Sequence, residues 1–316
     1  MFDLVLCPRA LCAALVLCLL TASTAGAARA DEPVFGFIYT TDLLPQGQKE
    51  MEQWLTWRHQ KAGGTYDQLE NRTEFSYGVS DRFQLSGYLN YNWSRAFHNG
   101  PDGATTPPEQ FSDYNVAPDG KFNATRFVGA SVEGIYRVLS PYTDAVGLAL
   151  LLEPTIGPNF KELEARAIVQ KNFLDDRLIL AANLTWAPEI RDLPANPYAD
   201  PDSTDAHANT NIETDLNWGI GASYRFAPNW SFGWEFQNER EVNQWAIFSR
   251  KQWMGSAYYT GPTIHYGGET FFATFTAWEQ LPWAKNYTDS SVIVGGRDYD
   301  VDFEKFRTRL KVGFYF

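Results

Sequence analysis

Apolar and polar residues alternate along most of the chain. In residues 229–239, for example, every second residue from Trp230 to Phe236 is aromatic, and the residues between them are small or polar. A period of two residues indicates β-strands with one apolar and one polar face. Twelve segments show this pattern, at about residues 48–59, 67–79, 82–94, 125–139, 145–156, 161–173, 177–189, 212–226, 229–239, 255–267, 269–281 and 303–316.

The connections between these segments alternate in length. Short turns lie at residues 80–81, 140–144, 174–176, 227–228 and 267–268, whereas long polar stretches lie at 94–123, 190–211, 238–254 and 282–302. The connections near Gly63 and Pro158 are intermediate. An even number of antiparallel strands, with short turns at one end and long loops at the other, is typical of outer-membrane barrels. We therefore expect an all-β fold over residues 48–316, a closed antiparallel up-and-down transmembrane β-barrel of 12 strands.

A soluble β-sandwich is the alternative fold. Its strands would also alternate, but its turns would show no such order of lengths, and its outer faces would not carry Trp, Phe and Leu together. A closed barrel also leaves no unpaired strand edge in lipid. The sequence therefore favours the barrel.

The first 30 residues predict a signal peptide. Arg9 precedes an apolar run, small residues follow, and residues 28–30 read Ala-Arg-Ala before Asp31, the expected mature N-terminus. The chain's 3 cysteines all lie in this segment, which excludes disulfides and thiolate metal sites from the mature chain. Residues 31–47 form an N-terminal segment that we expect on the periplasmic side. Three placements stay open for residues 34–44: a plug in the lumen, a partial strand, or a position along the periplasmic interface.

Composition narrows the classes of function. Aromatic residues make up 16% of the chain, which is typical of β-rich proteins and of aromatic belts at membrane interfaces. The net charge of -12 argues against an extended basic surface, so no nucleic-acid partner is expected.

The last strand carries a more specific signal. Residues 307–316 alternate and end in Phe316, and this strand resembles the C-terminal signal strand of Gram-negative outer-membrane β-barrel proteins. The resemblance implies export to the bacterial outer membrane, contact with its lipid and lipopolysaccharide, and a poorly characterised twelve-stranded branch with a Pro-x-Gly turn before the first strand, as at residues 45–47. It also implies that the barrel-assembly machinery recognises Leu310, Val312, Phe314 and Phe316. It identifies no substrate.

In each strand the polar residues occupy alternate positions, and we expect these positions to face the inside of the barrel. Many of them are charged. An Arg or Lys on the lipid face at mid-depth would cost about 2–4 kcal/mol, so we expect these side chains in the lumen. The acids are Glu50, Glu52, Glu70, Glu74, Glu133, Glu153, Glu162, Glu164, Glu213, Asp215, Glu235 and Glu239. The bases are Arg58, Arg72, Arg137, Arg166, Arg225, Arg307, Arg309 and Lys311.

Two functions fit such an interior. The first is a narrow pore or channel for passive passage of small hydrophilic solutes, in which the excess of acids mildly favours cations. The second is a non-transporting structural, adhesive or cell-surface interaction barrel that acts through its long loops near 94–123 and 190–211. A salt-bridged interior without a transport role is compatible with the second.

Catalytic and metal sites are not expected, and neither is a cofactor. None of the four histidines has a serine two residues away, and only Asp205 with His207 comes near the pattern of an outer-membrane protease. The acidic stretch that holds Asp200, Asp202, Asp205 and His207 matches no rigid calcium loop.

The alternation also predicts which residues meet. Leu216, Trp218 and Ile220 should face lipid, while Asn217, Gly219 and Gly221 face the lumen. Closure makes the first and last strands neighbours, so we expect Lys311 and Arg309 beside Glu52 and Glu50. The stagger of the strands leaves open that these charges face water separately.

Overall fold

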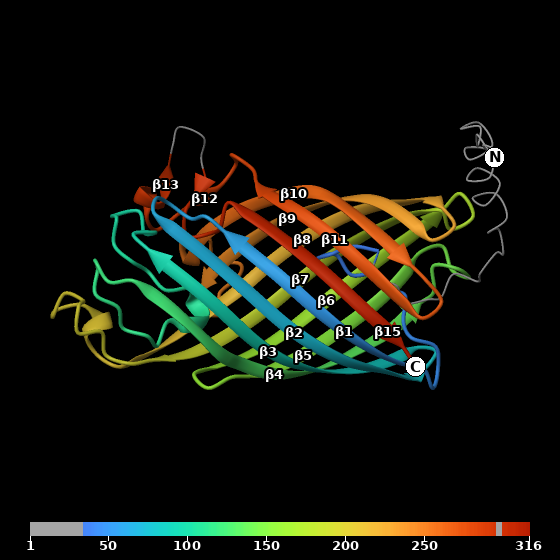
Figure 1. Cartoon of the computed structure of the whole chain (residues 1–316), viewed down its shortest axis with the longest axis horizontal. Helices are drawn as coiled ribbons and strands as arrows, with labels where there is room; N and C mark the ends of the chain where they lie inside the picture. The colour runs from blue at the N-terminus through green and yellow to red at the C-terminus, as the bar shows by residue number, and fades with distance from the viewer. Residues whose placement is uncertain (1–33, 295–298) are drawn as a thin grey trace, which may run out of the picture.

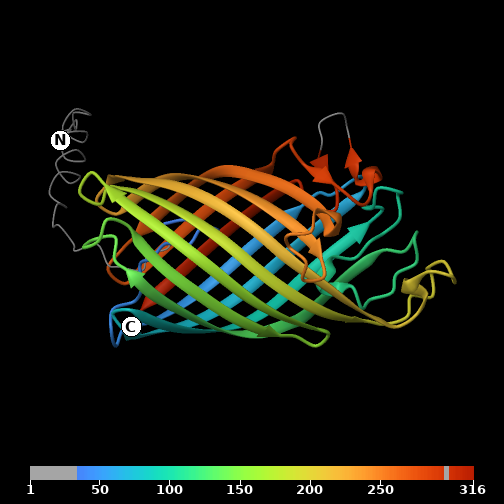
Figure 2. The ribbon, with the colours of Figure 1, turned by 180° about the vertical axis from the view of Figure 1, so that it is seen from behind.

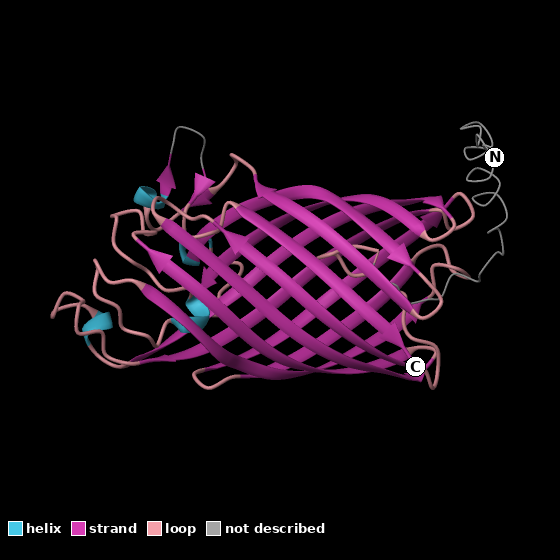
Figure 3. Ribbon diagram, viewed as in Figure 1, coloured by secondary structure: helices cyan, strands magenta, loops and turns pink. Residues whose placement is uncertain are grey.

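Twelve long strands close into one antiparallel barrel (Figures 1 and 3). The structure is a computed structural model that describes residues 34–294 and 299–316. The expected signal peptide and the cleavage before Asp31 therefore lie outside the described residues. The strands are β1 (Lys49–His59), β2 (Thr65–Ser80), β3 (Phe83–Phe97), β4 (Phe122–Leu139), β5 (Gly147–Ile156), β6 (Phe160–Phe173), β7 (Leu178–Leu193), β8 (Asn209–Ala227), β9 (Trp230–Asn243), β10 (Trp253–Gly267), β11 (Phe271–Gln280) and β15 (Phe306–Tyr315).

Each strand pairs with its neighbours in sequence, and β15 closes the ring between β11 and β1. This confirms the predicted twelve-stranded architecture. The last loop adds three short strands, β12 (Lys285–Asn286), β13 (Ile293–Val294) and β14 (Tyr299–Asp300). Helical structure in the described residues consists of four three-residue 3-10 turns, η1 (Glu109–Phe111), η2 (Thr204–Ala206), η3 (Arg250–Gln252) and η4 (Ser290–Val292). None of these is long or apolar enough to cross a membrane.

The long loops gather at the left end of the barrel in Figure 1, and the C-terminus lies at the right end. Figure 2 shows the same separation from behind. The long loops span residues 98–121, 194–208, 244–252 and 281–305. The connection at 157–159 is shorter than both neighbouring turns at the opposite end, 140–146 and 174–177, so the alternation of lengths fails at this connection.

The two faces of the strands differ as their alternation predicts. On β8, Trp218 is 41% and Ile220 is 50% exposed on the outer surface, while Gly219 and Gly221 are buried. On β4 the inward parity changes at Gly129, where the pairing with β3 is irregular, so Arg126 points inward together with Glu133. A bulge of this kind shifts a strand by one residue, which moves the rest of the strand to the other face.

The register at the closing seam differs from our expectation. Trp54 lies opposite Lys311 and Thr56 opposite Arg309, whereas Glu50 and Glu52 lie opposite Tyr315 and Gly313. The first and last strands, β1 and β15, are neighbours as predicted, and these charged side chains of both strands point inward. However, Lys311 and Arg309 are not the cross-strand partners of the two acids. The reason is the stagger between the first and last strands of a barrel, which the strand pattern alone does not encode.

Candidate functional site: the barrel lumen

Residues 34–44, which we call the lumen segment, lie inside the barrel. Phe35, Leu43 and Leu44 are fully or almost fully buried, and Phe37 stacks on Trp278 with ring centroids 3.9 Å apart. The blue chain before β1 can be followed between the strands in Figure 1. Of the three placements left open for this segment, the structure therefore shows the plug, inside the barrel and not in the periplasm.

Polar side chains on the barrel wall bind the backbone of the lumen segment. The Glu235 carboxylate accepts the N–H groups of Gly36, Phe37 and Ile38 at 2.8, 2.9 and 3.1 Å. Further bonds run from Tyr39 N–H to Asn183, from Thr41 N–H to Gln170 and from Leu44 N–H to Gln84, at 2.7 to 2.8 Å. Buried backbone groups need such partners where there is no sheet or helix to supply them. A hydrogen bond to a charged group contributes about 1.5–3 kcal/mol, which makes Glu235 the main anchor.

Two glycines of β8 make room for the lumen segment. A Cβ at Gly219 would lie 2.5 Å from Ile38 Cδ1, and a Cβ at Gly221 would lie 2.7 Å from Phe35 Cε1. The barrel wall is therefore shaped for this segment.

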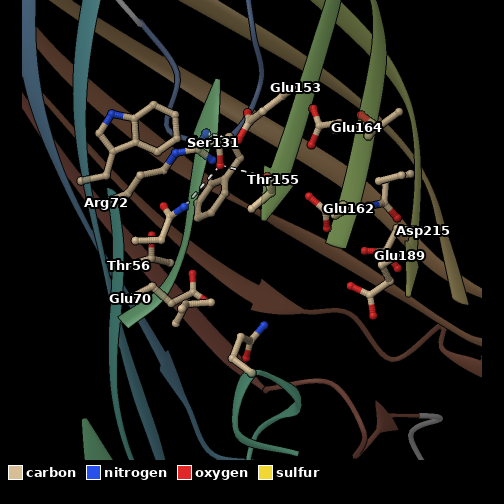
Figure 4. Close-up of a pocket in the computed structure, with 18 of the residues that line it drawn as sticks. Thr56, Glu70, Arg72, Ser131, Glu153, Thr155, Glu162, Glu164, Glu189 and Asp215 are labelled. Carbon is tan, nitrogen blue, oxygen red and sulfur yellow. Dashed lines mark hydrogen bonds and ion pairs between the residues drawn. The ribbon is translucent and has the colours of Figure 1, made fainter. Parts of the chain in front are cut away.

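A cavity of 320 Å³ lies next to the lumen segment, and we call it the upper cavity. Two residues of the lumen segment, Phe37 and Tyr39, line this cavity. Many of the expected lumen residues line it: Arg58, Glu70, Arg72, Glu153, Glu162, Glu164, Arg166, Asp215, Arg307 and Arg309. Figure 4 shows Glu162, Glu164, Glu189 and Asp215 apart from Arg72 and Glu70, with space between them.

A second, smaller hollow of 50 Å³ lies on another side of the lumen segment, where Ile38, Tyr39, Thr40 and Asp42 contribute to its lining. We call it the lower pocket. Four of the expected lumen residues line it: Glu52, Glu74, Glu133 and Lys311.

The remaining candidates lie elsewhere. Glu235 anchors the lumen segment, and Glu50 is buried opposite Tyr315. Arg137 donates to the backbone oxygen of Asp81 in a periplasmic turn, and Arg225 lies beside the turn at Arg177, so neither lines a cavity inside the lumen.

Two of the long loops fold into the mouth of the barrel. From the first, Phe111 is fully buried, Glu109 forms an ion pair of 3.0 Å with Arg191, and Gln110 binds Gln68 at 2.9 Å. From the last loop, Glu304 binds both Arg58 and Arg307. A hollow of 200 Å³ between these loops shares lining residues with the upper cavity, including Arg58, Glu109 and Asp215. It forms an outer vestibule.

The pKa of Glu304 shows that ion pairs hold the last loop at the mouth of the barrel. Burial alone would raise the pKa of its carboxyl, but Arg307 and Arg58 outweigh burial and lower the pKa to about 2. Glu304 therefore stays ionised and ties the last loop to strands β1 and β15.

Most of the bases in the lumen form ion pairs with carboxylates. Arg307 contacts both carboxylate oxygens of Glu239, at 2.5 and 2.8 Å. The other pairs are Arg58 with Glu70, Arg72 with Glu153, Arg166 with Glu164, and Arg191 with Glu189.

One wall of the lumen keeps an excess of negative charge. Across β5 to β9, adjacent inward positions hold Glu153, Glu162, Glu164, Glu189, Glu213, Asp215 and Glu241. In the described part of the chain, Glu162, Asp215 and Glu241 form no ion pair. The opposite wall, on β1, β2 and β15, carries Arg58, Arg72, Arg307, Arg309 and Lys311 together with Glu50, Glu52, Glu70 and Glu74. Of these acids, Glu70 lines the upper cavity, beside Arg58, Arg72, Arg307 and Arg309. The lumen is therefore electrically polarised from one side to the other.

Several lumen residues were not expected from the sequence. Glu189 and Arg191 lie on β7, which continues to Leu193, and extending the alternation past Pro188 would have found them. Glu109 reaches the lumen from a loop, and no signal in the sequence marks it. Trp54 and Tyr88 point inward although they are aromatic, each stacked under the Arg72 guanidinium.

The geometry does not favour a metal centre. Glu109, Glu189 and Glu213 bring carboxylate oxygens within 4.8 Å of one another, but Arg191 binds the first two. Among the described residues, no three of Asp200, Asp202, Asp205 and His207 bring their ligand atoms as close.

Solved structures share this fold at low identity. They include the COG4313 outer membrane channel from Pseudomonas putida F1, with a TM-score of 0.55 and 11% identity over 87% of this chain and 98% of that chain. The translocator domain of autotransporter NalP from Neisseria meningitidis has a TM-score of 0.51 and 10% identity, over 87% and 90%. The β domain of the Bordetella autotransporter BrkA has a TM-score of 0.50 and 10% identity, over 86% and 100%. At such identities the likeness extends to the fold alone.

No curated protein matches the sequence. A family model does match, over residues 27–316. The chain has the fold of outer-membrane β-barrel proteins, and it belongs to a family of unknown function, DUF6662.

Proposed function

We propose that this barrel is a narrow channel for passive passage of small hydrophilic solutes, closed at rest by its lumen segment. The observation that carries the proposal is the polar upper cavity, which meets the outer vestibule on one side and Phe37 and Tyr39 on the other. A barrel with no transport role would need neither the upper cavity nor a lumen segment that closes one end of this cavity. The likeness to a solved outer-membrane channel supports the same conclusion.

We propose further that the channel favours cations. Within residues 34–294 and 299–316, Glu162, Asp215 and Glu241 of the acidic wall have no basic partners, whereas most of the lumen arginines are held by carboxylates. A ring or wall of carboxylates raises the local concentration of cations and repels anions.

Conductance in a planar bilayer tests the proposal. We expect the wild-type barrel to pass little current and Glu235→Gln to pass more, because the amide group of Gln can accept only part of the three N–H bonds that hold the lumen segment. Glu279→Gln is the matched control, since Glu279 is exposed on the outer face of β11, two strands away in the ring.

A barrel that lacks residues 34–44 gives the limiting case. If neither this deletion nor Glu235→Gln conducts although both fold, the channel proposal is wrong, and a structural or surface-interaction barrel acting through its long loops takes its place.

A further inference from the structure

Two carboxylates meet at one tyrosine in the lower pocket. The hydroxyl oxygen of Tyr88 on β3 lies 2.8 Å from Oε1 of Glu74 on β2 and 2.8 Å from Oε1 of Glu133 on β4. All three side chains are at most 4% exposed. Bulk water therefore does not reach them to supply further hydrogen bonds.

The hydrogens at this site can be counted. Glu74 Oε1 is also 2.7 Å from the hydroxyl of Ser76, which is 2.7 Å from the hydroxyl of Ser86. These side chains make four oxygen–oxygen contacts of hydrogen-bond length. The three hydroxyl groups supply only three hydrogens, because each hydroxyl donates once. The fourth contact therefore needs a hydrogen on one of the two carboxyl groups.

We propose that Glu74 and Glu133 together bind one proton, and that this proton site helps to hold the lumen segment. Their second oxygens support the assignment independently. Oε2 of Glu74 and Oε2 of Glu133 are buried, and no described residue forms a hydrogen bond with either atom. An unpaired buried carboxylate is far more costly than an unpaired carbonyl of a neutral acid.

Arg72 and Lys311 lie near the pair, but no described cation forms an ion pair with Glu74 or Glu133. Arg72 stacks on the ring of Tyr88 at 3.6 Å and is paired with Glu153 on β5. Lys311 stacks on Trp54 at 3.8 Å. The other titratable groups that face the pocket are Glu52 on β1 and, from the lumen segment, Tyr39 and Asp42.

Loss of the proton has a mechanical consequence. It places a second negative charge in a pocket of 50 Å³ that Ile38, Tyr39 and Thr40 help to enclose. Repulsion and the uptake of water would then enlarge the pocket and loosen the segment. The closed barrel is therefore the protonated one, and rising pH favours the open one.

Infrared spectroscopy of the purified, full-length barrel tests the proton itself, whether or not the barrel conducts. At neutral pH we expect the carbonyl band of a protonated carboxylic acid to weaken by the same amount in Glu74→Gln and in Glu133→Gln. The NH₂ group of either Gln donates the missing hydrogen, so the remaining carboxyl ionises. The double variant should lose no more than either single variant. Glu269→Gln, in an exposed periplasmic turn, is the control and should leave the band unchanged.

The outcomes are distinct. A band that neither variant weakens, or two losses that add in the double variant, overturns the shared proton. If one Gln variant does not fold, the other decides alone, because either substitution removes the same proton. If neither folds, the wild type decides: its band should weaken at the pH at which the lumen segment becomes accessible, and a band that stays constant across that transition overturns the shared proton.

A second measurement connects the proton to the segment. A single cysteine in place of Thr40 should react faster with a thiol reagent as pH rises, beyond the increase caused by ionisation of the thiol. The same cysteine in the Glu133→Gln background supplies that reference, because this variant has no shared proton to lose and keeps one negative charge at the site as pH rises. Equal pH profiles in the two backgrounds would show that the proton does not hold the segment.

Discussion

Glycine is required at position 221 because of what lies against it. The ring of Phe35 occupies the space that a side chain on this inward position of β8 would fill. Polar inward positions and Gly together are common in barrel strands, so the sequence alone does not distinguish a glycine that faces water from one that faces a plug. The contact partner, far away in sequence, makes the difference.

We expect Gly221→Ala to release the lumen segment and leave the barrel folded. Overpacking of this kind typically costs about 1–3 kcal/mol, and the segment is the part that can move. Proteinase K followed by mass spectrometry should show cleavage within residues 34–44 in the variant and protection in the wild type. Gly87→Ala is the control, because no atom lies within 4 Å of its added Cβ. Equal protection in both variants would contradict the assigned packing.

At the scale of elements, the last extracellular loop contains a titratable anchor. Asp300 of β14 is buried, accepts the N–H of Asp302 at 3.0 Å, and is 3.2 Å from the amide of Asn286. Burial raises the pKa of its carboxyl from 3.8 to about 6. The protonated form therefore stabilises the folded loop.

The sign of the pH effect follows. The stabilisation is fully present below about pH 4 and is lost as pH rises through about 6, by an amount on the order of 2 kcal/mol. We expect the amides of residues 281–293 in the wild type to exchange faster at pH 7 than those in Asp300→Asn, which cannot ionise, and the two proteins to match at about pH 3, below both pKa values. Comparing them at the same pH removes the intrinsic pH dependence of exchange. A constant ratio at both pH values would argue against the assignment.

The terminal strand β15 leads to a prediction about assembly. Phe316 is 64% exposed on the outer face, and its ring lies 5.8 Å from that of Phe75. We propose that the assembly machinery recognises it, so Phe316→Ala should lower the yield of inserted barrel without affecting export. Phe271→Ala is the control, an exposed aromatic residue of neighbouring β11 near the same end. Heat-shifted mobility on a gel reports insertion, and equal yields for the two variants would refute a special role for Phe316.

The elements also show how far the sequence could predict this protein. Strand alternation is local, and it predicts β8 or β15 to within a few residues. The seam register is not local, because the offset of Lys311 from Glu52 depends on the stagger accumulated around the whole ring. The lumen segment has no periodic pattern. Its backbone is satisfied by Glu235, Asn183 and Gln170 on three different strands, and only the closed barrel brings these together.

For the whole molecule, the main consequence is the electrical polarity of the lumen. The acids of β5 to β9 face the bases of β1, β2 and β15, so a solute in the upper cavity lies in a transverse field. The sequence predicts that most of these side chains point into the lumen. Their separation onto two walls depends on the order of the strands in the ring, which only the structure shows.

We expect Asp215→Asn and Glu162→Gln to lower the preference for cations, together more than singly, since each removes an unpaired negative charge from the cavity. The reversal potential under a salt gradient measures this in the conducting Glu235→Gln background. Glu279→Gln serves again as the outer-face control and should change nothing. A reversal potential that stays constant in the double variant would show that the acidic wall does not select the ion.

The anchor at Glu235 also imposes an order of events during folding. Its bonds to the lumen segment join residues 197 to 199 positions apart in the chain, and the neighbouring contacts involve β6, β7 and β3. Contacts of such long range form late, because the loops that they close must be ordered first. The segment is the first described part of the chain to be synthesised, yet it reaches its binding site only when the wall exists. Each new barrel therefore exists for a time with an empty lumen, and the channel that we propose would be open in the cell envelope during that time.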